Sequence, residues 1–328
     1  MDIARVKEYL GAEWTAVQEC ISGSLESDID LLNQTNKSIL SHSGKQLRPI
    51  LALLTARACS ADACASEATI RYAAAAELMH NATLLHDDVA DCSEKRRGVP
   101  TIMSLMGPSV AVLIGDYWLV RALDSILTDA PSDAGVLKIF SRTLSALAEG
   151  ELLQLQKAQK GDTVEADYLR IIYNKTASLF EASCVSAALS VGASDQTVDA
   201  MRSYAVALGR AFQIKDDILD YDGTESVGKP LGVDILEQKI TIPLLGAMAN
   251  AGAEEEARIR VLVKDIVAHP EHRDEIVDFV KSNGGLEYAV AELVKYVGQA
   301  VAALGVLPDS YEKKCLIELA HFTARRKK

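Results

Sequence analysis

Apolar residues recur at helical spacing along most of the chain, and convincing strand alternation is absent. The segment 70–91, "IRYAAAAELMHNATLLHDDVAD", is apolar nearly all round, which predicts a helix buried in the middle of a large bundle. The segment 203–223, "SYAVALGRAFQIKDDILDYDG", is built in the same way. Prolines fall between the apolar segments or at their edges, where helical proteins tolerate them. The pattern therefore predicts an all-α fold.

Polar residues at the predicted helix ends suggest where helices begin and stop. Asp162 followed by Glu165 has the spacing of a capping box and predicts that a helix opens there. We expect that helix to run to Gly192, because a glycine provides a C-terminal stop. Ser194 and Asp195 then offer caps for a further helix that reaches residue 222 or 223.

The chain is expected to form one domain. It has 328 residues with no internal repeat, low-complexity tract or long linker, so we expect a single compact domain over residues 1–328. Hydrophobic residues make up 49% and aromatic residues only 5%, so the core is mostly Ala, Leu, Val and Ile, which favours helices over sheet. The expected architecture is a large helical bundle.

Charge and targeting signals limit the partners and the location. A net charge of −12 argues against nucleic acid or an anionic membrane as the main partner. The N-terminus lacks the basic start and apolar run of a signal peptide, and no uncharged apolar stretch approaches the roughly 18 residues of a membrane span. The six cysteines are scattered without a Cys-x-x-Cys pattern, which is typical of reduced thiols. We expect a soluble, cytoplasmic protein.

A first acidic cluster stands at the end of the apolar segment 70–91. On a helix, Asp91 lies one turn beyond Asp87 and Asp88, so the three carboxylates share one end of one face. Their mutual repulsion is unfavourable, and it grows near apolar surroundings and at a helix C-terminus. By itself, the cluster could equally be a solvated acidic helix end.

A second cluster repeats this spacing in another apolar segment. Gln213, Asp216, Asp217 and Asp220 lie on one helical face at i, i+3, i+4 and i+7. Two such clusters facing each other would form a mouth lined by carboxylates, and hard oxygen ligands suit Mg²⁺. The duplication favours a metal site over two solvated helix ends.

Basic residues occur where a phosphate would need them. Arg96 and Arg97 follow the first cluster, and guanidinium groups bind phosphate oxygens with two hydrogen bonds. Further candidates are Lys45 and Arg48 in "SGKQLRP", Lys175 with Thr176 in "NKTASLF", and Lys229 and Lys239 in "GKPLGVDILEQKIT". A single lysine is more often just solvated, an interpretation that fits Lys175 poorly because it interrupts an apolar segment.

Other polar residues near the first cluster have less specific interpretations. His80 lies seven residues before Asp87 on nearly the same helical face, although a lone histidine there is more often part of a core. His86 faces another side of the helix and is expected to be structural, and Cys92 is expected to take no part, because Mg²⁺ has little use for a thiol. The C-terminal "ARRKK" is expected to be a solvated tail, although it could close over a bound diphosphate.

These motifs, in this order, resemble the trans-isoprenyl diphosphate synthases. The matching stretches are "GKQLRP", "LLHDDVADCSEKRRG", "KTASLF" and "FQIKDDILDYDG" with "GKPLGVD", and they extend from about residue 40 to 245. The resemblance implies an all-α bundle around a deep central cavity and a homodimer. It also implies a prenyltransferase that joins isopentenyl diphosphate to an allylic diphosphate primer.

The resemblance also implies a role for each candidate residue. The metal ligands would hold Mg²⁺, with three ions per active site when substrate is bound: Asp87, Asp88, Asp91, Asp216, Asp217 and Asp220. Arg96, Lys175, Gln213 and Lys229 would contact the allylic diphosphate, and Lys45, Arg48, His80 and Arg97 would hold isopentenyl diphosphate. Thr176 and Lys239 match positions near the site. Catalysis would rest on Asp87, Asp88, Asp91, Lys175, Asp216 and Asp217.

Product length should depend on the helix wall behind Asp87. Members of the family that make short products place bulky aromatic residues four or five positions before the first aspartate, where this chain has Thr83 and Ala82, with Met79 one turn further. The thirteen residues from Asp87 back to Ala74 span roughly 20 Å of helix axis. We therefore expect an octaprenyl-like product longer than C20, which would bring the enzyme transiently to membranes.

Several alternatives remain open. A geranylgeranyl or farnesyl diphosphate synthase would use the same motifs with a shorter product. A class I terpene cyclase shares the first cluster but normally pairs it with an Asn/Ser/Glu-type motif, and a metal phosphohydrolase would leave the second cluster without a role. A non-catalytic synthase subunit usually lacks some of the aspartates, and this chain keeps all six.

Overall fold

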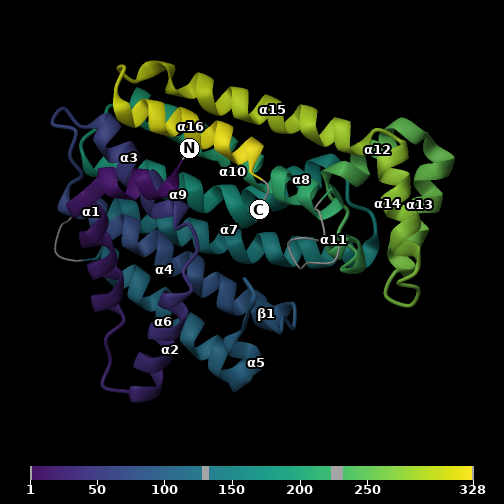
Figure 1. Ribbon diagram of the computed structural model, residues 1–328, viewed down its shortest axis with the longest axis horizontal. Coiled ribbons are helices and arrows are strands. Elements are labelled where there is room, and N and C mark those ends of the chain that lie inside the picture. Colours follow the sequence, from purple (N-terminus) through teal and green to yellow (C-terminus); the bar gives the residue numbers. More distant parts are fainter. Residues whose placement is uncertain (1, 128–132, 223–231, 327–328) are drawn as a thin grey trace. The chain divides into compact units, whose positions relative to one another are not determined.

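The computed structural model describes residues 2–127, 133–222 and 232–326 (Figure 1). Helices dominate this part of the chain, which confirms the predicted all-α class. The α-helices are α1 (Ile3–Ser24), α2 (Asp30–Ser41), α3 (Leu47–Cys59), α4 (Glu67–Ala90), α5 (Ile102–Met106), α6 (Pro108–Ile126), α7 (Asp133–Lys160), α8 (Glu165–Ile172), α9 (Ser178–Ser190), α10 (Asp195–Asp222), α11 (Val233–Leu236), α12 (Ile242–Ala251), α13 (Ala253–Asp265), α14 (His272–Ser282), α15 (Gly285–Ala303) and α16 (Tyr311–Arg325). The described residues also form a π-helix, η1 (Tyr173–Ala177), and a 3₁₀-helix, η3 (Leu304–Val306). They include two short strands, β1 (Lys95–Arg96) and β2 (Val99–Pro100).

The chain divides into two compact units. The first unit comprises Met1–Thr143, Ala182–Arg202 and Val306–Leu316, and the second comprises Leu144–Glu181, Ser203–Gly305 and Ile317–Lys328. Helices α7, α9, α10 and α16 each contribute residues to both units. The single domain over residues 1–328 stays a prediction.

Helix α4 is the core helix of the first unit. It packs against α1, α3 and α6, so three of its sides are covered, as its nearly continuous apolar sequence predicts (Figure 1). Alanines 73–76 are fully buried, and their small side chains let neighbouring helices approach closely. The helix begins at a capping box, in which the Ser66 hydroxyl accepts from the Thr69 amide and the Thr69 hydroxyl accepts from the Ser66 amide.

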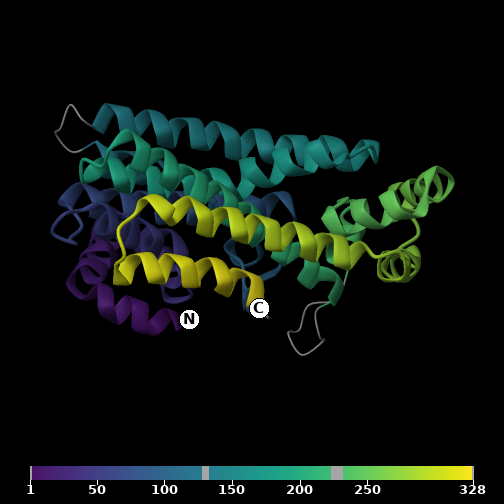
Figure 2. The ribbon, with the colours of Figure 1, turned by 90° about the horizontal axis from the view of Figure 1, so that it is seen from above.

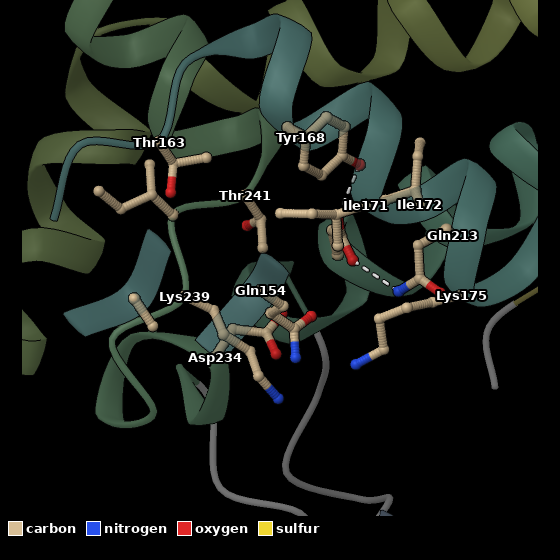
Figure 3. Close-up of a pocket in the computed structure, with 13 residues that line it drawn as sticks. Gln154, Thr163, Tyr168, Ile171, Ile172, Lys175, Gln213, Asp234, Lys239 and Thr241 are labelled. Carbon is tan, nitrogen blue, oxygen red and sulfur yellow. Dashed lines mark hydrogen bonds between the residues drawn. The ribbon is translucent and has the colours of Figure 1, made fainter. Parts of the chain in front are cut away.

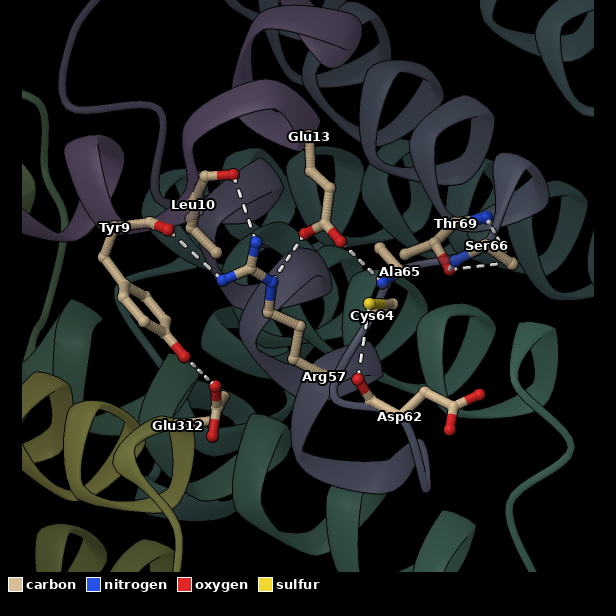
Figure 4. A network of polar contacts seen from close by, with 10 residues as sticks. All are labelled: Tyr9, Leu10, Glu13, Arg57, Asp62, Cys64, Ala65, Ser66, Thr69 and Glu312. Atoms are coloured by element: carbon tan, nitrogen blue, oxygen red, sulfur yellow. Dashed lines mark hydrogen bonds and ion pairs between the residues drawn. The ribbon is translucent and has the colours of Figure 1, made fainter.

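A polar network connects α1 to α3 and to the start of α4 (Figure 4). The Arg57 Nε donates to Glu13 Oε2 at 2.6 Å, and the same guanidinium donates to the carbonyl oxygens of Tyr9 and Leu10. Glu13 in turn accepts from the Ala65 amide at 2.8 Å. Because the Arg57 guanidinium donates hydrogen bonds to two carbonyl groups of α1, it fixes α1 against α3, which itself packs on α4.

Helix α12 organises the end of the second unit that is coloured green in Figures 1 and 2. It is apolar, with Ile242 through Met248 buried, and it packs against α13, α14 and α15, which both views show grouped together. Among the described residues, one segment, Gly285–Val306, has the length and hydropathy of a membrane span. Its buried residues pack on α12, and one such helix is weak evidence for a membrane protein.

The structure corrects the predicted start of the helix after residue 162. Helix α8 begins at Glu165, and the Val164 amide donates to the Asp167 carboxylate, whereas Asp162 pairs with Lys157 at 3.2 Å. The expected continuous helix is also interrupted by η1 before α9 ends near Gly192, whose φ is +71°. The next helix is confirmed: α10 begins at Asp195, and the Ser194 hydroxyl accepts from the Thr197 amide.

Two glycines let α7 and α10 approach η1. A Cβ at Gly150 would lie 2.7 Å from the Asn174 Cβ, and a Cβ at Gly209 would lie 2.5 Å from the Ala177 Cα. Both distances are shorter than any normal contact, so only glycine allows this packing. The π-helix that carries Lys175 is therefore held between two closely packed helices.

Alanine at Gly209 should destabilise the protein. The added methyl group would collide with backbone, so we expect a loss of about 1–3 kcal/mol of unfolding free energy, the usual cost of overpacking. Gly298 in α15 is the matched control, because a Cβ at this position would have no neighbour within 4 Å and alanine is a better helix former there. Thermal unfolding of both variants should show a lower midpoint for G209A and an equal or higher one for G298A. Equal midpoints would contradict the close packing at Gly209.

Candidate active site

The first aspartate cluster lies at the C-terminal end of α4, in three different environments. Asp88 is buried, Asp87 is half-buried, and Asp91 is exposed at the C-cap position. The buried Asp88 carboxylate accepts from the Arg96 Nε at 2.8 Å. Burial raises the pKa of Asp88, whereas the charge of Arg96 lowers it. The pair therefore supplies a buried carboxylate with a cation from the following loop.

The loop that carries the arginines is a β-hairpin, which the sequence did not suggest. Lys95 pairs with Pro100, and Arg96 pairs with Val99, in an antiparallel ladder. Arg97 sits in the turn with a φ of +53°, and its guanidinium donates to the His42 carbonyl oxygen at 3.1 Å. Gly44 leaves room for this guanidinium, because a Cβ there would lie 2.7 Å from the Arg97 Cζ. The hairpin thus points Arg96 at α4 and Arg97 at the segment before α3.

Several residues assigned to isopentenyl diphosphate lie within the first unit. Arg48 belongs to the first turn of α3, Lys45 is exposed just before it, and His80 is half-buried on α4. Burial, together with the charges of Arg48 and Arg97, lowers the pKa of His80 well below its ordinary value. His80 is therefore a neutral imidazole that can donate one hydrogen bond at neutral pH.

A cavity of about 90 Å³ lies between the end of α4 and the arginine hairpin. Its polar lining includes Asp88, Arg96, Arg97, Asn81 and His42. It gathers a carboxylate and two guanidinium groups at one opening, which suits an anionic ligand bound together with a cation.

The second cluster forms a buried hydrogen-bond chain on α10. The Tyr168 hydroxyl donates to Asp217 Oδ2 at 2.6 Å, and Gln213 Nε2 donates to Asp217 Oδ1 at 3.0 Å. Thr176 in turn donates to Gln213 Oε1 at 2.9 Å, which fixes the orientation of the amide. Three of the predicted residues, Thr176, Gln213 and Asp217, are thus brought together.

Negative charge accumulates around Asp217. Burial raises the pKa of Asp217 to about 7, the Asp216 and Asp220 charges add to the rise, and the bonds from Tyr168 and Gln213 oppose it. Asp234 is half-buried, and desolvation of its carboxyl, together with the charges of Asp217 and Asp220, holds its pKa well above the ordinary value. Such a cluster favours binding of a cation.

The third aspartate of this motif has a structural contact. The two carboxylate oxygens of Asp220 accept from the amides of Val233 and Asp234, each at 3.1 Å. These bonds cap the N-terminus of α11 and bring Asp234 beside the cluster. Lys229, which was assigned to the allylic diphosphate, lies outside the described residues.

Lys175 occupies the π-helix η1, and π-helical turns often occur at functional sites. Its ammonium group forms an ion pair with Glu151 of α7, and Lys239 forms one with Glu237. Both lysines line a cavity of about 150 Å³ in the second unit, together with Gln154, Asp217 and Asp234. Figure 3 shows the ends of Lys175, Lys239 and Gln154 on one side of this cavity and Tyr168 on the opposite side.

The predicted chain-length residues lie on α4. Ala82 and Met79 are fully buried, and Thr83 is half-buried with its hydroxyl donating to the His80 carbonyl oxygen. Neither the cavity beside Asp88 nor the cavity beside Asp217 includes them. Their place in a product tunnel stays a prediction.

Several residues of the site were not predicted from the sequence. Tyr168 gave no signal, because a tyrosine in an amphipathic helix is ordinary, and Glu151 was hidden in a helix with many charges. Asp234 could have been noticed as an acid within the apolar run "LGVDIL". The expected solvated C-terminal tail is wrong at Arg326, which is buried and pairs with Asp216 at 2.8 Å. His86 has the expected structural contact, with Nε2 3.3 Å from Asp116 of α6.

The donor chemistry of both clusters fits a divalent cation. Each cluster offers carboxylate oxygens, the ligands that Mg²⁺ prefers. In each cluster, one aspartate forms an ion pair with an arginine, which is Arg96 for Asp88 and Arg326 for Asp216. The clustered charge that raises the pKa of Asp217 is a further reason to bind a cation. Within the described residues, no three metal-ligating side chains already converge on one point, and the arrangement in which the two clusters face each other stays a prediction.

Replacing Asp217 with asparagine should change how stability depends on pH. The folded chain keeps a proton on Asp217 up to about pH 7, whereas the unfolded carboxyl loses it near 3.8, so the metal-free protein loses stability as pH rises between these values. D217N removes this loss, and its melting temperature should exceed that of the parent chain by a few degrees at pH 8 and converge with it near pH 4.

The exposed Asp91 provides the control for this experiment. D91N removes the same charge from an exposed position and should follow the pH profile of the parent chain. The measurement is thermal unfolding in the presence of a chelator from pH 4 to pH 8. A constant difference between D217N and the parent would contradict the raised pKa.

Comparison with known proteins identifies the family. The polyprenyl synthetase family model matches residues 29–280. The octaprenyl diphosphate synthase of Escherichia coli (strain K12) is 36% identical over 328 residues, which cover 99% of each chain. The solved structure of a decaprenyl diphosphate synthase from Rhodobacter capsulatus aligns with a TM-score of 0.91 at 33% identity over 100% of both chains.

A second solved structure carries ligands. It is a polyprenyl synthase from Caulobacter crescentus CB15, complexed with calcium and isoprenyl diphosphate, which aligns with a TM-score of 0.90 at 32% identity over 100% of this chain and 98% of that one. These findings confirm the resemblance to trans-isoprenyl diphosphate synthases and the isoprenoid synthase fold. Since the family model spans both aspartate clusters and most of the chain, the protein belongs to the polyprenyl synthetase family, whose members are prenyltransferases.

Proposed function

We propose that this protein condenses isopentenyl diphosphate with an allylic diphosphate and extends it to a long-chain polyprenyl diphosphate. The observation that carries the proposal is the duplicated aspartate motif on α4 and α10, inside a family match that covers both. The relatives named octaprenyl and decaprenyl diphosphate synthase, each similar along nearly the whole chain, support a long product.

The family is magnesium-dependent, and we assign the six aspartates to the metal, with three ions when substrate is bound. Asp87, Asp88 and Asp91 would supply ligands from α4, and Asp216, Asp217 and Asp220 from α10. When bound, Mg²⁺ neutralises the negative charge that develops on the departing diphosphate. The Caulobacter crescentus structure, with calcium and isoprenyl diphosphate, supports a divalent cation at such a site.

Cationic side chains and the Gln213 amide would bind the two diphosphates. Lys175, Gln213 and Arg96 are assigned to the allylic diphosphate, together with Lys229. Because the Thr176 hydroxyl occupies Gln213 Oε1, the amide nitrogen of Gln213 is the group that can donate to a ligand. Lys239, which lines the same cavity as Lys175, would stand near this diphosphate.

Isopentenyl diphosphate is assigned to Lys45, Arg48, His80 and Arg97. The lowered pKa of His80 keeps its ring neutral beside the arginines, so it can donate a hydrogen bond without adding charge repulsion. The guanidinium groups of Arg48 and Arg97 would bind phosphate oxygens with paired hydrogen bonds.

The bond changes follow from this arrangement. The allylic C–O bond breaks and its electron pair leaves with the diphosphate, while the double bond of isopentenyl diphosphate attacks the allylic carbon. A proton is then lost from the new cation to the released diphosphate, so no side-chain base is required. Water would capture the allylic cation, and the buried apolar face of α4 behind Asp88 keeps the surroundings dry.

We also infer a homodimer that works in the cytoplasm. Exposed apolar side chains on α6, among them Leu113 at 68% and Val120 at 55% exposure, support an interface with a second copy. All six cysteines are free thiols, which suits a reducing compartment. The polyprenyl product would draw the enzyme transiently to membranes.

The experiment that tests the function uses the purified full-length chain. It is incubated with Mg²⁺, labelled isopentenyl diphosphate and farnesyl or geranylgeranyl diphosphate, and the products are sized by mass spectrometry. We expect polyprenyl diphosphates longer than C20. A cyclic hydrocarbon would indicate a terpene cyclase. Release of phosphate without chain growth would indicate a phosphohydrolase, and the absence of any reaction would indicate a non-catalytic subunit.

Bulky side chains on α4 should shorten the product in a graded way. A82F places a ring about one turn behind Asp87, and A75F places one about 10 Å deeper along the axis, so A75F should allow about two more isoprene units than A82F. Both alanines are fully buried in the parent chain, so circular dichroism should first establish that each variant folds. Equal product lengths in the parent and both variants would remove this face of α4 from the product tunnel.

A further inference from the structure

Arg326, the last described residue of the chain, is buried in the second unit. Its side chain is 8% exposed, although it belongs to the basic terminal run "ARRKK". One guanidinium nitrogen lies 2.8 Å from Asp216 Oδ1 and donates to the Phe212 carbonyl oxygen at 2.8 Å. The guanidinium carbon lies 3.9 Å from the centre of the Phe212 ring, so the group also stacks on an aromatic face.

These contacts hold the end of α16 to the second aspartate cluster, but they leave one polar group unsatisfied. The Arg326 Nε is buried without a hydrogen-bond partner among the described residues. An unsatisfied buried donor offsets part of the gain from the ion pair. The Asp216 side chain keeps 42% of its surface exposed, so solvent and ions can reach its carboxylate. The pair is therefore specific in geometry but modest in net free energy.

The carboxylate that Arg326 contacts is one that the proposed function assigns to Mg²⁺. An oxygen that accepts from a guanidinium at 2.8 Å cannot present the same lone pair to a metal. The first cluster shows the same arrangement, where Arg96 occupies Asp88. Arg96 follows its aspartates closely in the chain, whereas Arg326 reaches Asp216 from the opposite end of the second unit's sequence.

We propose that Arg326 is an internal competitor of the metal: its ion pair with Asp216 fastens the C-terminal end of α16 to the second aspartate motif until a divalent cation displaces it. The proposal rests on the assignment of Asp216 to the metal. Because the two events share one carboxylate, they are linked in both directions. Metal binding loosens the C-terminal end, and removal of the arginine strengthens metal binding.

Arg325 offers a matched control for Arg326. It is the preceding arginine, it is exposed, and within the described part of the chain its Nε donates to the His321 carbonyl of its own helix. The variants R326Q and R325Q remove the same charge from adjacent positions. The readout is the dissociation constant for Mn²⁺, added alone to metal-free full-length protein and followed by electron paramagnetic resonance.

We expect R326Q to bind Mn²⁺ about two- to fivefold more tightly than the parent chain, which is the range for an ion pair with one half-exposed partner. R325Q should bind as the parent chain does. Unchanged or weaker binding in R326Q, with Mn²⁺ still bound by the parent, would overturn the competition but leave the metal assignment in place. If neither the parent nor R326Q bound Mn²⁺, the metal assignment and the competition would both be wrong.

Hydrogen–deuterium exchange of the C-terminal peptide gives a second readout that a folding defect in R326Q cannot imitate. In the parent chain, Mg²⁺ alone should increase deuterium uptake in the peptide that contains residues 322–326. In D216N the uptake should already be high without metal, because the anchoring charge is gone. Reduced or unchanged uptake on adding Mg²⁺ would contradict the displacement of Arg326.

Discussion

The repulsion among carboxylates that are held in apolar helices is the constraint on which the rest of this structure depends. Burial and neighbouring negative charge raise the pKa of Asp217 to about 7 and hold that of Asp234 well above its usual range. Such clusters persist only where something else stabilises the fold and where a cation compensates the charge. The packed core of α4 and the hydrogen bonds from Tyr168 and Gln213 provide the first condition.

Two arginines compensate cluster charge in the described part of the chain, because Arg96 pairs with Asp88 and Arg326 pairs with Asp216. Lys175 and Lys239 instead pair with the glutamates Glu151 and Glu237. Under the proposed function, each of these side chains would exchange a carboxylate for a phosphate oxygen or release a carboxylate to a metal. One charge-assisted contact would then replace another of the same kind.

Unusual backbone conformations hold several of these charged side chains in place. Lys175 stands on a π-helix between helices that approach closely only because Gly150 and Gly209 lack a Cβ. Arg97 points from a hairpin turn whose left-handed φ of +53° directs it toward the His42 carbonyl. Asp220 fixes α11 and with it Asp234. Strained or close-packed backbone of this kind is stabilised by the rigid helices around it.

The sequence by itself determined the helical class, the buried course of α4 and α10, and the aspartate and basic motifs, because helical periodicity and residue chemistry are local properties. Only the tertiary structure decided which charges meet. The bond from Tyr168 to Asp217, the pair of Lys175 with Glu151 and the burial of Arg326 join residues far apart in the chain, and no local pattern encodes them. The π-helix, the β-hairpin and the start of α8 at Glu165 likewise depend on packing, which overrides the weak preference of the local sequence.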